Sequence, residues 1–146
     1  MSTEENKVNT RRAIEESWNQ GNVAIFDKLC APNYIHHDSA QPNVRSQADY
    51  KRWVTETRSA FSGLRVTVED LIAEGEQVVT RWTLRGANTG DIVRPIRIPA
   101  TGKQVEVMGI TIVRFAGGKM VEDWHQLDNL SLFQQVGALP MPQPAR

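Results

Sequence analysis

Hydrophobic positions recur at helical spacing in the first part of the chain and alternate with polar positions in the rest. Val8, Ile14 and Trp18 form an apolar stripe that predicts a first helix. Ser2 or Thr3 is a suitable N-cap, and the helix is expected to stop at Gly21. The pattern therefore predicts a helical N-terminal part.

Two further helices follow. A short one is expected between Asn22, as its N-cap, and Pro32, which ends it. Ser46 followed by Asp49 resembles a capping box and predicts a third helix from about Gln47 to Phe61. That helix carries an apolar stripe of Tyr50, Trp53, Val54, Thr57 and Phe61.

After Ser62-Gly63 the spacing changes to the alternation of β-strands. Strands are predicted from residue 64, over 77–85, over 105–115 and after the Gly117-Gly118 turn, followed by a short helix over 129–135. Helices followed by a meander of strands predict an α+β fold, a curved antiparallel sheet wrapped around N-terminal helices. We expect one domain over 1–146, with a core of about 6–138 and a loose proline-rich tail at 139–146.

The last strand has two chemically different faces. One face combines a large aromatic with an amide and two carboxylates, which fits either a pocket wall or a solvated outer face: Met120, Glu122, Trp124, Gln126 and Asp128. A two-residue hairpin turn would place Thr111 opposite Trp124 and Gly109 opposite Gln126. Thr111, Trp124, Gln126 and Asp128 would then share a pocket face. A slip of one residue would present Met108, Ile110 and Ile112 instead.

Composition narrows the function classes. The 146 residues include 17 basic and 17 acidic side chains that form no long run of one sign, which argues against nucleic acid and against an anionic membrane as partner. No apolar run reaches the length of a membrane span, and the start of the chain lacks a signal peptide's features.

The single cysteine, Cys30, is expected to be a small core residue, and a cytoplasmic protein is the simplest interpretation. Apolar residues on both sides of the predicted sheet favour a homo-oligomer, and a dimer is the oligomer expected.

A family resemblance begins in the last strand. Gly-Lys-Met-Val-Glu-Asp-Trp-His-Gln-Leu-Asp (118–128), followed by Leu-Ser-Leu-Phe-Gln-Gln-Val-Gly (130–137), resembles the C-terminal region of SnoaL-like polyketide cyclases. The resemblance extends over about residues 6–138 and implies the cone-shaped fold of nuclear transport factor 2, with an internal pocket. It also implies that Asp128, four residues after the tryptophan, is a general acid/base.

The same resemblance implies further site residues. Ala-Pro-Asn-Tyr-Ile-His-His-Asp (31–38) matches the family's entry into the pocket, with Tyr34 on its aromatic and His37 on its histidine. Trp53 is expected mainly in the core but within reach of the cavity. The loop Asp91–Pro99, which carries Arg94 and Arg97, is longer than the family pattern, so it puts the substrate in doubt.

The function implied is a cofactor-free intramolecular aldol closure on a hydrophobic, polyketide-like small molecule, with Asp128 as acid/base and His37 as hydrogen-bond partner. Tyr34, Trp53, Arg81, Thr111, Trp124 and Gln126 would bind the substrate. The three histidines show no metal-ligand spacing, so no metal site is expected. Three alternatives stay open: a hydroxylase, an epoxide-hydrolase-like enzyme using Arg81 and Asp128, or a ligand-binding protein without turnover. Of the two adjacent histidines, His37 is expected in the site, and His36 is expected to face solvent or the helices.

Overall fold

The computed structural model describes residues 2–141 as a five-stranded sheet with helices packed against it. Part of the tail that was expected to be loose, 142–146, lies outside the described residues. The elements in chain order are α1 (Thr3–Ala13), the π-helix η1 (Ile14–Asn19), α2 (Ile25–Leu29), β1 (Cys30–His37), α3 (Gln47–Ala60), β2 (Ser62–Glu74), β3 (Gln77–Ala87), β4 (Gln104–Ala116), β5 (Lys119–Leu127) and α4 (Asn129–Gln135). Among residues 2–141, no helix combines the length and apolar character that a membrane span requires.

Local sequence explains where the helices begin. The side chain of Ser2 accepts a hydrogen bond of 3.1 Å from the backbone N–H of Glu5, which caps α1. At α3, Ser46 and Asp49 form the predicted capping box, with each side chain accepting from the other residue's backbone N–H. The helical segment that was predicted at the start of the chain is continuous, because α1 passes directly into η1.

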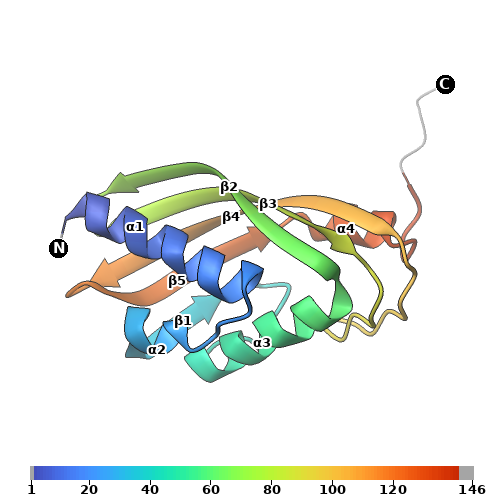
Figure 1. Ribbon diagram of the computed structural model, residues 1–146, viewed down its shortest axis with the longest axis horizontal. Helices are drawn as coiled ribbons and strands as arrows, with labels where there is room; N and C mark the ends of the chain where they lie inside the picture. The colour runs from blue at the N-terminus through green and yellow to red at the C-terminus, as the bar shows by residue number, and fades with distance from the viewer. Residues whose placement is uncertain (1, 142–146) are drawn as a thin grey trace.

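The sheet has the order β1-β5-β4-β3-β2, and its strands pair antiparallel except for β1, which runs parallel to β5. The predicted α+β fold, a curved sheet around N-terminal helices, is confirmed. Figure 1 shows α1, α2 and α3 on the side toward which the sheet curves. Their apolar faces enclose the core there, with Trp53 and Val54 of α3 both buried.

The β4–β5 hairpin corrects the predicted register. Gly117 and Gly118 both have positive φ, and Ala116 pairs with Lys119, as the two-residue turn requires. A β-bulge follows at once, because Phe115 pairs with Met120 whereas Arg114 pairs with Glu122, which leaves Val121 unpaired. Thr111 therefore lies opposite His125, and the predicted pairing of Thr111 with Trp124 is wrong.

The bulge decides which side chains of β5 face the helices. A shift of one residue moves every later side chain to the other face of a strand. Asp123 and His125 are buried on the inner face, whereas Trp124 and Gln126 are exposed on the outer face. On β4 the predicted inner face is correct, since Val107 and Val113 are buried and Met108 and Ile110 are exposed outside.

Candidate active site

A cavity of about 100 Å³ lies between the inner face of the sheet and the helices. Roughly 10–15 Å³ on this measure suffices for one water, so the space admits several waters or part of a small molecule. Most of its wall is apolar and aromatic, with rings from η1, α2, α3 and its C-cap, β1 and β3: Trp18, Phe26, Tyr34, Tyr50, Trp53, Phe61 and Trp82. Such a wall suits an apolar ligand that a few polar groups orient.

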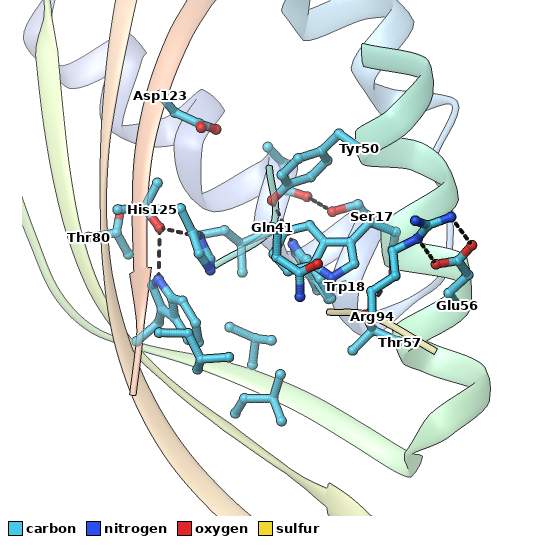
Figure 2. A pocket seen from close by; sticks show the side chains of 18 of the residues that line it. Ser17, Trp18, Gln41, Tyr50, Glu56, Thr57, Thr80, Arg94, Asp123 and His125 are labelled. Atoms are coloured by element: carbon cyan, nitrogen blue, oxygen red, sulfur yellow. Dashed lines mark hydrogen bonds and ion pairs between the residues drawn. The ribbon is translucent and has the colours of Figure 1, made fainter. Parts of the chain in front are cut away.

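Asp123 is the carboxylate on the sheet side of this wall. Figure 2 shows its side chain on the sheet side of the cavity, across from Tyr50 of α3. The Tyr34 hydroxyl donates to Asp123 Oδ2 at 2.5 Å, and His36 Nδ1 lies 2.5 Å from Asp123 Oδ1. Only 5% of the Asp123 side chain is exposed, and the His36 side chain is fully buried. Two charge-assisted hydrogen bonds of this kind fix the carboxylate in position.

Burial sets the protonation of the groups around Asp123. It raises the pKa of the Tyr34 hydroxyl well above its usual range, and the negative charge of Asp123 raises it further. Tyr34 therefore stays protonated and donates. Burial also raises the pKa of the Cys30 thiol to about 12, so this cavity-lining cysteine is protonated at neutral pH and is no nucleophile.

His125 supplies a second polar group, two residues beyond Asp123 on the same face of β5. Burial, together with the charge of His36, lowers the pKa of His125 to about 3, so the imidazole is neutral at pH 7. Its Nδ1 lies 3.2 Å from Thr111 Oγ1, and its Nε2 is buried without a hydrogen-bond partner. An unpartnered buried nitrogen is costly unless a ligand or water satisfies it.

An ion pair stands at the other side of the cavity. Arg94, from the loop between β3 and β4, binds Glu56 of α3 through Nε at 2.7 Å and through a terminal nitrogen at 3.3 Å (Figure 2). Both residues line the cavity, and about a third of the Arg94 side chain is exposed. The neighbouring Val93 is also a lining residue and is 41% exposed. This side is therefore where the cavity meets solvent.

Metal ligands are not assembled in the part of the chain that the structure describes. No group of three or more His, Cys, Asp or Glu side chains between residues 2 and 141 is arranged to hold an ion.

Comparisons with known proteins identify the family. A family model, the SnoaL-like polyketide cyclase, matches residues 8–136. The chain belongs to the SnoaL-like polyketide cyclase family. A search of curated proteins found no match.

Solved structures with the same fold include relatives of the SnoaL-like family. A candidate polyketide cyclase from Acidithiobacillus ferrooxidans is 31% identical with a TM-score of 0.79, covering 93% of this chain and 97% of the other. TsrD from Streptomyces laurentii is 27% identical with a TM-score of 0.83, covering 95% and 99%. AclR, a candidate hydroxylase from Streptomyces galilaeus, is 25% identical with a TM-score of 0.82, covering 97% and 87%. The fold therefore occurs in proteins assigned to different reactions.

Three of the site residues that were expected from the sequence line the cavity: Tyr34, Trp53 and Thr111. They come from β1, α3 and β4. The longer loop also reaches the cavity through Arg94, whereas Arg97 is exposed and pairs with Asp91 at 3.2 Å.

The other expected site residues lie outside the cavity wall. Asp128 is exposed and caps α4, where its carboxylate accepts from the backbone N–H of Ser131 at 3.0 Å. Trp124 and Gln126 are on the outer face because of the bulge. Arg81 pairs with Asp70 at 2.5 Å, and neither Arg81 nor Asp128 lines the cavity, where the expected fragment of an epoxide-hydrolase site would have to lie.

The choice between the adjacent histidines is also corrected. His37 is half-buried outside, stacked on Trp124 with ring centroids 5.5 Å apart and 2.7 Å from Glu122. His36 is the histidine that turns inward to Asp123. Strand alternation could have shown this, because Tyr34 and His36 are two residues apart on β1 and share a face. Asp123 and His125 carried no such signal, since their face depends on the bulge.

Proposed function

We propose that this protein is an enzyme that closes a ring by an intramolecular aldol reaction, with Asp123 as the general acid/base. The observation that carries the proposal is a buried carboxylate in an apolar cavity wall, held by Tyr34 and His36. A carboxylate held in this way can remove a proton next to a carbonyl and later return it. Asp123 takes the role that the sequence motif assigned to Asp128.

The steps balance within one substrate molecule. Asp123 removes a proton from the carbon between two carbonyls, which leaves an enolate. That carbon forms a bond to the carbon of a third carbonyl further along the same molecule, whose C=O π bond breaks so that its oxygen becomes an alkoxide. Asp123 then returns the proton to the alkoxide, and no oxidant or reductant is consumed. His125, which lies on the same strand face, donates from Nε2 to the oxygen that becomes negative.

The cavity wall supports a hydrophobic, enolisable substrate. Trp18 and Trp53 lie edge to face at 5.3 Å, and Tyr50 lies edge to face with Trp53 at 5.5 Å. Rigid rings of this kind hold a flexible chain in a folded conformation, which brings the two reacting carbons together. The carboxylates and the guanidinium of the wall lie in two places, Asp123 beside His125 and Glu56 paired with Arg94.

Incubation with a linear β-polyketone ester in D₂O tests this function. We expect deuterium to enter the carbon between the carbonyls and a cyclic product of the same composition to accumulate. Mass spectrometry and proton NMR measure both. A product that has gained an oxygen atom would instead indicate a hydroxylase, as AclR is described, and binding without exchange would indicate a ligand-binding protein.

We also propose that the protein forms a homodimer through the outer face of its sheet. Met108, Ile110 and Trp124 are 46%, 44% and 38% exposed on neighbouring strands, and Ile35 on β1 is exposed beside them. Several large apolar side chains exposed on one face are unfavourable in water, and a second copy of the chain would cover them.

Sedimentation velocity at micromolar concentration is expected to show a dimer for the wild type and a monomer for Ile110→Glu. The charge would be buried without a partner in the interface. Glu106→Gln, on an exposed position of the same strand, is the control and should sediment as the wild type does. A monomeric wild type would overturn the proposal.

A further inference from the structure

Two side chains connect His125 to β3 in a single hydrogen-bonded chain. The indole Nε1 of Trp82 donates to Thr111 Oγ1 at 3.0 Å, and the same oxygen lies 3.2 Å from His125 Nδ1. The Trp82 ring is also stacked on the imidazole, with centroids 5.2 Å apart and planes at 29°. All three side chains line the cavity.

The direction of this chain follows from what each group can do. An indole N–H donates and cannot accept, whereas a threonine hydroxyl has one hydrogen and accepts at its lone pairs. Trp82 occupies one lone pair of the Thr111 hydroxyl, and His125 Nδ1 is the acceptor within reach of the remaining hydroxyl hydrogen. A neutral imidazole that accepts at Nδ1 carries its hydrogen on Nε2. The unpartnered Nε2 is therefore a donor.

The position of Trp82 depends on a glycine of the neighbouring strand. Gly109 pairs with Trp82 between β4 and β3. A Cβ added at Gly109 would lie 2.3 Å and 2.5 Å from two carbons of the indole ring. Any larger residue would displace the ring that reaches Thr111, so the absence of a side chain at 109 is what lets the indole lie across β4.

We propose that Trp82 and Thr111 are positioning residues that hold His125 in the tautomer with hydrogen on Nε2. In this state His125 donates to the substrate oxygen that becomes negative. The other tautomer would present a lone pair to that oxygen and repel it. The inference rests on the proposed function for its catalytic meaning, but the tautomer itself is a property of the ligand-free protein.

NMR of ¹⁵N-labelled protein at pH 7 without substrate tests whether Trp82 and Thr111 set the tautomer of His125. The wild type is expected to show a protonated Nε2 and an unprotonated Nδ1 for His125, as one tautomer. Trp82→Phe keeps an aromatic ring against the imidazole but removes the donor that orients the Thr111 hydroxyl, so this hydroxyl can turn and accept from Nδ1. A measurable population with hydrogen on Nδ1 is expected in that variant.

Two controls distinguish an effect of the Trp82–Thr111–His125 hydrogen bonds from a general effect of packing around His125. Thr111→Ser keeps the hydroxyl and should keep the wild-type tautomer. Trp53→Phe changes the other indole beside His125, which lies edge-on at 5.2 Å and 84°, and should also leave the tautomer unchanged. A wild-type His125 with hydrogen on Nδ1, or a Trp82→Phe protein with the tautomer of the wild type, would overturn the proposal. Failure of the cyclisation assay alone would count against the proposed function and not against the role of Trp82 and Thr111 in setting the tautomer.

Discussion

Asp123→Asn is expected to reduce turnover by roughly a hundredfold to ten-thousandfold, the range for losing an acid/base or its correct tautomeric partner. The amide cannot take a proton at neutral pH. It also offers a single acceptor where Tyr34 and His36 both donate to the carboxylate, so one of these two hydrogen bonds must be rearranged. Rates of deuterium incorporation and ring closure measure the loss.

Asp128→Asn is the matched control, because it makes the same chemical change at the residue that the sequence motif pointed to. Asp128 is exposed and serves as an N-cap, and asparagine caps helices about as well as aspartate. We expect this variant to keep wild-type turnover and thermal stability. Loss of activity in Asp128→Asn with retention in Asp123→Asn would reinstate the motif-based assignment and refute the role given to Asp123.

The second large effect is on stability at mildly acidic pH. Burial lowers the pKa of His125 to about 3, whereas an unfolded histidine titrates near 6.5. Below pH 6.5 the unfolded chain therefore binds a proton that the folded protein excludes. The stabilisation of the folded state by the neutral imidazole is complete above that pH and is lost progressively as the pH falls toward 3.

Between pH 6.5 and 5 this group alone is expected to remove about 2 kcal/mol from the free energy of unfolding. Urea titrations of the wild type and of His125→Phe, each at pH 7 and at pH 5, measure the difference. The comparison of the two proteins isolates the effect of the imidazole at position 125. With a urea m-value of about 1–3 kcal/mol/M, the wild-type midpoint should fall about 1 M further than that of the variant.

Gln126→Ala serves as the control for this comparison. The residue is adjacent to His125 but exposed on the outer face, and its replacement adds or removes no titrating group. The variant should keep the wild-type pH dependence. If His125→Phe and the wild type lost the same stability between pH 7 and 5, the buried neutral state of His125 would be refuted.

Several features of this protein could be read from the sequence because local chemistry determines them. The capping box at Ser46 and Asp49, the helix over 129–135 and the Gly117-Gly118 turn all occur where they were predicted. Each depends on residues within a few positions of one another. The order of helices and strands then limited the fold to a curved sheet around helices, and the motif at 118–137 indicated the family.

Tertiary structure alone decided which side chains meet in the cavity. A single unpaired residue, Val121, reverses the faces of β5, so Asp123 and His125 replace Trp124 and Gln126 inside. Period-two alternation cannot reveal a bulge, because the extra residue changes the pairing and not the composition of the strand. The Asp123–His36 contact joins residues 87 positions apart, and it exists only because β1 runs parallel to β5 at the edge of the sheet. No local pattern encodes that pairing, and so the centre of the site was decided by the packing of distant segments.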